Sequence, residues 1–388
     1  MSEVSHIPSE AEIARRHDNI RHAAEDAGID AVLVCGSEYT GFEGAITYTC
    51  GFRLLHRYAY VLIPVEGEPT CIFPQEARWV GDHSETFVEE RVFAETPGEW
   101  VRERLRERGL RRVGVYGLDF AMPVRDYRAL ADGDAELVRF DEGFDRARAV
   151  KSEEELRSVR ASMAINEAGV RAVVDAYAPG RTEAELMGEA ERTFAASGTT
   201  RLTMDMVLAG SDGAMPPQMR HPDPGRPIAS GDLLLYGLEV AGPGGHWVEF
   251  SRPLCDGPLA PDTEALLDAY REYHAAAREH LRDGASAHDV HRAVSRPFTE
   301  RGYQLGHVTG HSIGMTMIEF PRVGEGADVE LRENMTLSMH PHAYNEDRTA
   351  CLYMQDTWLV GAEAGEPLSQ VPITVFGGPG GRVGSEGG

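Results

Sequence analysis

Hydrophobic positions along the chain follow two periods, one typical of strands and one typical of helices. In the first 150 residues, apolar runs between turn residues predict strands at 30–35, 58–64, 69–73 and 112–116. The helical period predicts helices at 97–109 and 124–130. Ser9 followed by Glu12 is a capping box, and it opens a first helix that ends near Gly28. Strands alternating with helices indicate an α/β domain over residues 1–150.

The pattern changes at residue 151, where a second series of elements begins. Capping boxes at 152–155 and 182–185 predict the starts of two helices. Strands follow to about residue 254, then two helices at 261–284 and 286–302, and then three strand-like segments. This order predicts an α+β domain over residues 151–376. The Gly-rich segment 377–388 cannot bury enough apolar surface to fold, so we expect a flexible tail.

Four polar side chains interrupt apolar, strand-like runs of this second domain: Glu249, His311, His340 and Gln355. The segment 306–321 reads as one Gly-bounded strand that carries His311 into the interior. The segments 335–344 and 351–360 are expected to converge on it. A buried polar group must find a partner or it lowers stability. Four such groups in four such runs therefore predict one shared polar site.

Composition excludes several classes of protein. The chain has 63 acidic and 38 basic residues, a formal net charge of -25, whereas nucleic acids and anionic membranes attract basic surfaces. Its five cysteines form no CxxC pair, so neither a disulfide framework nor a zinc knuckle is indicated. The N-terminus lacks a signal sequence, and no run approaches the ~20 apolar residues of a spanning helix. We expect a cytoplasmic protein that binds neither nucleic acid nor membranes.

Several segments of the chain resemble the creatinase/prolidase/aminopeptidase-P family, whose catalytic domain has the pita-bread fold. The pieces, in the family's order, are RAVKSEEELRSVR, the loop ending in His221 before SGDLLLYGLEV, VEFSRPL, GHSIG, and MTLSMHP followed by MQDTWLVG. Such enzymes also carry a smaller N-terminal domain, so the resemblance covers most of the chain. It implies a pita-bread α+β domain preceded by a smaller α/β domain.

The family's metal-binding members hold two metal ions with five ligands: two Asp, one His and two Glu. The chain resembles these members but departs from their ligand set. Gly237 stands at the first Asp position and Glu249 at the second. His311 matches the histidine, while His340 and Gln355 stand at the two Glu positions. Two dications need bridging carboxylates. The resemblance therefore argues against a conventional two-metal peptidase.

The first functional hypothesis is hydrolysis of a C–N bond without a cofactor, as in creatinase, which has also lost the metal set. The resemblance implies that His221 activates water and protonates the leaving nitrogen, and that Glu249 holds the substrate. His311 and His340 would complete the catalytic group. Arg57 matches an arginine that binds a substrate carboxylate from the neighbouring subunit. The protein would then be a homodimer, with the N-terminal domain of one subunit near the other's site, acting on a small carboxylate-bearing non-peptide substrate.

Two alternatives remain open. In one, Glu249, His311 and His340 hold a single divalent metal, iron or zinc, for a hydrolase, lyase or oxygenase reaction in specialised metabolism. In the other, the chain is a non-catalytic pseudo-peptidase. Four further residues are predicted to contact the substrate: Gln355, His342, Glu239 and Trp247.

Overall fold

The structure is a computed structural model that describes residues 4–38, 43–54, 57–81, 86–199, 201–209, 220–306, 308–377 and 382–383. The chain divides into two compact units. The N-terminal unit consists of residues 1–154 and 315–320, and the C-terminal unit consists of residues 155–314 and 321–388. No helix of the described chain is long and apolar enough to cross a membrane. The predicted domain boundaries and the cytoplasmic location stay predictions.

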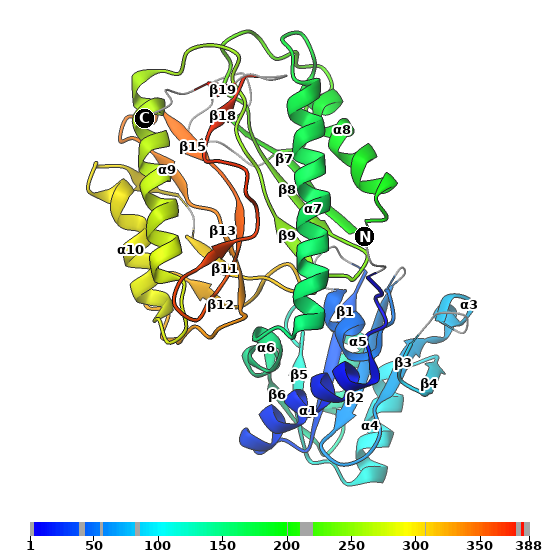
Figure 1. The fold of residues 1–388 in the computed structure, drawn as a ribbon. Helices are drawn as coiled ribbons and strands as arrows, with labels where there is room; N and C mark the ends of the chain where they lie inside the picture. The colour runs from blue at the N-terminus through cyan, green and yellow to red at the C-terminus, as the bar shows by residue number, and fades with distance from the viewer. Residues whose placement is uncertain are drawn as a thin grey trace. The chain divides into compact units, whose positions relative to one another are not determined.

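The N-terminal unit is a six-stranded mixed sheet with helices (Figure 1, blue and cyan). Its strand order is β4-β3-β2-β1-β5-β6. The strands are β1 (Ala31–Ser37), β2 (Tyr58–Pro64), β3 (Thr70–Pro74), β4 (Glu90–Ala94), β5 (Arg112–Tyr116) and β6 (Glu136–Arg139). The helices are α1 (Glu10–Asp26), α2 (Gly44–Cys50), α3 (Arg78–Gly81), α4 (Pro97–Arg108), α5 (Val124–Ala131) and α6 (Asp141–Ala149), with a short 3₁₀ turn at Gln75–Ala77.

Strand β1 shows why this sheet forms. All seven of its residues are buried, as expected for a central strand covered on both faces. Val32 and Val34 pack into one apolar cluster, whereas Leu33 and Cys35 pack into another. Because successive side chains point to opposite faces of a sheet, the continuous apolar run supplies both cores.

Among its described residues, the C-terminal unit carries four helices and the remaining strands. The helices are α7 (Glu153–Ala176), α8 (Glu183–Ala196), α9 (Pro261–His280) and α10 (Ala287–Thr299). One sheet has the order β7-β8-β9, with strands β7 (Arg201–Ala209), β8 (Leu235–Ala241) and β9 (Trp247–Glu249). In Figure 1, α7 and α8 lie on one side of the strands and α9 and α10 on the other.

The other strands of this unit form three sheets. A five-stranded sheet has the order β12-β11-β13-β16-β17 and a three-stranded sheet the order β10-β14-β15, while β18 pairs with β19. The strands are β10 (Gln304–Leu305), β11 (Gly310–Ser312), β12 (Glu319–Val323), β13 (Thr336–Met339), β14 (His342–Tyr344), β15 (Cys351–Tyr353), β16 (Asp356–Leu359), β17 (Glu366–Pro367), β18 (Val375–Phe376) and β19 (Arg382–Val383).

The prediction of one strand over residues 306–321 is wrong. The segment instead contains strand β11 (Gly310–Ser312) and the start of strand β12 (Glu319–Val323). Its residues 315–320, which include that start, cluster with the N-terminal unit. Met315 is buried in an apolar cluster of that unit, and Glu319 forms ion pairs with Arg148 and Lys151. Burial of Met315 and charge pairing of Glu319 favour this position over a longer strand.

The two later segments also break, and both breaks fall at predicted site residues. The segment 335–344 divides at His340 and Pro341 into β13 and β14, which lie in different sheets. Proline has no N–H to donate to a strand ladder, which explains the interruption. The segment 351–360 divides at Met354 and Gln355 into β15 and β16. His340 and Gln355 therefore stand between sheets rather than within one strand.

Candidate metal centre

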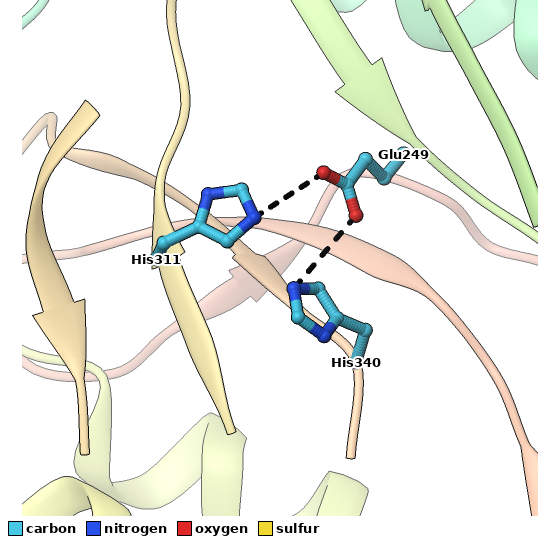
Figure 2. A group of neighbouring side chains, drawn as sticks. All are labelled: Glu249, His311 and His340. Carbon is cyan, nitrogen blue, oxygen red and sulfur yellow. Dashed lines mark ion pairs between the residues drawn. The ribbon is translucent and has the colours of Figure 1, made fainter. Parts of the chain in front are cut away.

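Glu249, His311 and His340 point toward one another from three different segments (Figure 2). Nε2 of His311 lies 3.4 Å from Oε1 of Glu249, and Nε2 of His340 lies 4.0 Å from Oε2. One ligand atom from each side chain lies within 4.8 Å of the other two. All three side chains are buried, and the imidazole ring centres are 5.1 Å apart. The structure thus brings together three of the residues that the sequence placed in one site.

The hydrogen bonding of His311 fixes the atom that faces Glu249. Nδ1 of His311 lies 3.0 Å from the backbone oxygen of Ser312. A carbonyl oxygen can only accept, so Nδ1 carries the proton of the neutral ring. In the neutral ring Nε2 therefore keeps its lone pair toward the centre of the group, which is the tautomer that a metal ligand requires. In the charged ring Nε2 carries the proton that faces Glu249.

The charges of the group are unevenly balanced. Burial would raise the pKa of Glu249, but the hydrogen bond and charge of His311 and the charge of His340 outweigh it and lower that pKa to about 2. Burial lowers the pKa of His311, and Glu249 reverses this, so its net shift is upward. In the described chain, Glu249 has two histidines and no lysine or arginine as ion-pair partners. The carboxylate is therefore ionised in a place where a divalent cation can replace the imidazolium protons.

The side-chain amide of Gln355 closes one side of this group. The backbone N–H of Leu238 donates to Oε1 of Gln355 at 3.1 Å, which identifies that atom as the oxygen. The NH₂ group therefore faces two carboxylates, and it donates to Oε1 of Glu239 and to Oε2 of Glu249, each at 3.1 Å. Gln355 thus joins the two strands that carry the acids, although it is 106 positions away from Glu249.

The backbone places Glu239 and Glu249 on the same face of the hairpin formed by β8 and β9. The two residues are directly paired in the antiparallel register, so their side chains share a face. Burial and then the charge of Glu249 raise the pKa of Glu239 well above its usual value, against the effect of the Gln355 hydrogen bond. The pKa values of two buried acids side by side are thus shifted in opposite directions, downward for Glu249 and upward for Glu239.

Two more predicted substrate contacts lie near this group. Trp247 is buried in β9, two residues before Glu249 and thus on the same strand face. His342 is half-buried in β14, and its ring centre lies 6.1 Å from that of Tyr353. The Tyr353 ring in turn lies 6.5 Å from that of His340.

The structure does not place His221 or Arg57 in the group. His221 is exposed, and its side chain has no hydrogen bond or ion pair with any residue that the structure describes. Its loop is held instead by Arg220, which forms a bidentate pair with the buried carboxylate of Glu183. Arg57 belongs to the N-terminal unit, where it is half exposed and lies 3.4 Å from Glu76. Their proposed roles stay predictions.

Sequence reasoning missed two residues beside Gln355. Thr357 accepts the backbone N–H of Glu249 at 2.9 Å and donates to its carbonyl at 3.0 Å. Tyr353 is buried, and burial followed by the charge of Glu249 raises the pKa of its phenol. Tyr353, Gln355 and Thr357 are spaced two apart, so alternation around Gln355 was a usable signal.

Comparison with known proteins identifies the class that this fold and site define. The sequence model of Metallopeptidase family M24 matches residues 157–362, and that of the Creatinase/Prolidase N-terminal domain matches residues 16–150. "Probable dipeptidase PepE" of Mycobacterium bovis is 27% identical over 345 residues, covering 85% of this chain and 88% of its own.

Solved structures show the same fold. The prolidase from Pyrococcus horikoshii OT3 superposes with a TM-score of 0.78 at 20% identity, covering 92% of this chain and 98% of its own. Dipeptidase PepE from Mycobacterium ulcerans gives a TM-score of 0.78 at 23% identity, covering 94% and 98%. This chain belongs to the M24 metallopeptidase family. The predicted fold class, a creatinase-type N-terminal domain before a pita-bread domain, is confirmed.

The expectation that the enzyme uses no cofactor is wrong. The chain belongs to a metallopeptidase family, and Glu249, His311 and His340 form a group of metal-ligating side chains. The expectation gave weight to the missing carboxylates. However, one carboxylate and two neutral imidazoles are sufficient to bind a single dication.

Glu249, His311 and His340 offer donor atoms of the types that a divalent cation accepts. Two ligand atoms about 2.1 Å from a tetrahedral zinc lie about 3.4 Å apart, which matches the 3.4 Å between His311 and Glu249, whereas His340 lies farther from Glu249 at 4.0 Å. A second cation beside Oε2 of Glu249 meets the NH₂ group of Gln355, which is a donor and cannot ligate.

Proposed function

We propose that this chain is a single-cation hydrolase of the M24 family, which cleaves a C–N bond in a small carboxylate-bearing compound. The observation that carries the proposal is the orientation of Gln355. Its oxygen is engaged by the Leu238 N–H, so its NH₂ group covers the carboxylate oxygens that a second cation would need. The remaining donors are two imidazoles and one ionised carboxylate, which suit one divalent ion such as zinc or iron.

Glu249, His311 and His340 would hold the cation, through Oε1 or Oε2 and the two Nε2 atoms. A cation bound there supplies Lewis acidity and lowers the pKa of a bound water. The Ser312 carbonyl keeps His311 in the ligating tautomer. Burial and the charge of Glu249 raise the pKa of Glu239, which makes it a candidate proton donor within the site, and the Tyr353 phenol is a second candidate donor.

The substrate class follows from the family and the size of the side chains around the group. Relatives are named as dipeptidases and prolidases, and a dipeptide carries a free carboxylate. Trp247 and His342 add ring surfaces on which a small organic substrate could pack. We propose a small non-peptide amide or amidine rather than a peptide, with Arg57 binding its carboxylate within a homodimer.

The test is metal stoichiometry of protein purified without a His-tag, combined with hydrolysis assays on Xaa-Pro dipeptides and small N-acyl or amidino acids. We expect about one zinc or iron per chain. Glu249→Gln should lower metal content below ~0.1 per chain and abolish hydrolysis, with an unchanged circular dichroism spectrum. Two metals per chain, or turnover that is unaffected by complete metal removal, would contradict the proposal. Efficient cleavage of dipeptides, with no cleavage of the small non-peptide compounds, would contradict the proposed substrate but not the proposed single cation.

Gln355→Glu is the matched variant for the stoichiometry. It replaces the NH₂ donor by a carboxylate of the same size and so adds an anionic ligand between Glu239 and Glu249. The variant should gain affinity for a second cation, whereas wild type titrated with the same zinc concentrations should saturate at one. If wild type and Gln355→Glu bind the same number of zinc ions per chain, Gln355 is not what limits the site to one cation.

A further inference from the structure

Helix α7 carries a stripe of buried polar side chains, which is unusual for a helix packed in a core. Glu155, Ser158, Ser162 and Asn166 follow one another at spacings of three, four and four, so they share one face. Each is at most 4% exposed. Apolar neighbours on the same helix, including Val159 and Met163, belong to the core cluster that also contains strands β8 and β9.

The first three residues of the stripe contact the turn of the β8–β9 hairpin. Ser162 donates to the backbone oxygen of His246 at 2.8 Å and accepts from the Gly242 N–H at 3.1 Å. Oγ of Ser158 lies 2.9 Å from Nδ1 of His246, and Oε1 of Glu155 lies 3.6 Å from its Nε2. These contacts provide hydrogen-bond partners for the residues of the turn. The turn lies beyond the Ala241–Trp247 pair, so it is not directly beside the Glu239–Glu249 pair.

Asn166 contacts the strands themselves. Its Nδ2 donates to the backbone oxygen of Leu238 at 2.9 Å and, more weakly, to that of Val248 at 3.4 Å. These two residues directly precede Glu239 and Glu249. Leu238 is held on both sides, because its N–H donates to Gln355 and its carbonyl accepts from Asn166. One buried amide on α7 thus joins both strands of the hairpin next to both acids.

A buried amide lowers stability unless its hydrogen bonds are made, and Oδ1 of Asn166 has no hydrogen-bond partner among the described residues. An apolar residue would fill this helix position at least as well. The contacts of Asn166 therefore indicate a task that packing alone does not perform. We propose that Asn166 is a positioning residue, which fixes the register and separation of β8 and β9 so that Glu249 meets His311 and His340. This inference rests on the proposed metal function.

The experiment compares Asn166→Ala with Ser162→Ala in the full-length protein. The two residues share the helix face, are fully buried and bond to backbone of the same hairpin, but only Asn166 contacts the strands beside the acids. The first measurement is the melting temperature of each metal-free protein. The second is the dissociation constant for Zn²⁺, obtained by competition with a chelator at a temperature where all three proteins are folded.

We expect both variants to lose similar thermal stability, since each removes a buried hydrogen bond to backbone. Asn166→Ala should weaken Zn²⁺ binding by about 10- to 100-fold, the range found when groups that orient metal ligands are removed. Ser162→Ala should change it by less than about 3-fold, a bound set below that range. Asn166→Ser, which keeps a shorter donor, should give an intermediate value and replaces Asn166→Ala if the latter does not fold.

Unchanged Zn²⁺ affinity in Asn166→Ala, or an equal loss in Ser162→Ala, would overturn the positioning role while leaving the metal function intact. Wild-type protein that binds no Zn²⁺ would instead refute the proposed function, and the positioning role with it.

Discussion

Two groups of buried charges, one in each unit, differ in how their charges are balanced. In the N-terminal unit, Glu319 lies 3.1 Å from Arg148 and 3.0 Å from Lys151, and Asp145 lies 2.7 Å from Arg148. All four side chains are buried. Burial would raise the pKa of Glu319, but Arg148 and Lys151 outweigh it and the net shift is downward. The chain itself supplies a permanent cation for each acid.

In the C-terminal unit, the carboxylate of Glu249 has only imidazoles as ion-pair partners among the described residues. A histidine is neutral or charged according to its surroundings, whereas arginine and lysine stay charged. The first group is therefore complete without any ligand, and the second can exchange protons for a metal ion. Buried charge alone does not indicate function; what matters is whether the chain provides the fixed counter-charge.

The largest expected effect that tests this comparison comes from removing Arg148. Arg148→Met leaves the carboxylates of Glu319 and Asp145 short of one cation in a buried place. Loss of one partner of a buried pair reduces stability by about 3–5 kcal/mol. Urea denaturation followed by circular dichroism should show this loss, with the metal content of the folded protein unchanged.

The matched control is Arg146→Met, which changes an exposed arginine on the same helix and should alter stability by less than ~1 kcal/mol. The comparison fails if Arg148→Met is as stable as this control, or if it loses its metal while remaining folded.

Metal removal should have the next largest effect. A ligand that binds only the folded protein stabilises it by about 2.7 kcal/mol when present at 100 times its dissociation constant. Differential scanning calorimetry should therefore show a melting temperature that rises with Zn²⁺ concentration and falls after chelation. Glu249→Gln should show no such dependence, while Arg148→Met should keep it. An identical response of wild type and Glu249→Gln would place the metal elsewhere.

The smallest effect on stability is expected when an exposed ion pair is removed. Such a pair can be compared with the two buried groups. Arg160 contacts Glu366 at 2.7 Å and 3.1 Å, with both side chains nearly half exposed. Water and salt screen such a pair, so Arg160→Met should change stability by ~0–1 kcal/mol and the change should shrink in 1 M salt. Urea midpoints at low and high salt measure this. A loss near that of Arg148→Met would show that burial is not what separates these groups.

Sequence alone was sufficient for the architecture and for three residues that the structure brings together. The change from alternating strands and helices to a helix-rich second series indicated two domains, and the family resemblance gave the fold. Glu249, His311 and His340 were identified because a polar residue within an apolar run must find a partner when buried. That rule needs no coordinates, since it follows from residue type and local pattern.

Tertiary structure decided what those residues do together. The amide orientation of Gln355 depends on the Leu238 N–H, and the tautomer of His311 depends on the Ser312 carbonyl. The position of residues 315–320 depends on Met315 and Glu319 finding partners far away in sequence. The sequence pattern indicates which buried polar side chains need a hydrogen-bond or ion-pair partner. Which residue becomes that partner depends on contacts between segments that are distant in sequence. For that reason the sequence could indicate a polar site, and only the folded protein could show that the NH₂ group of Gln355 donates to both Glu239 and Glu249.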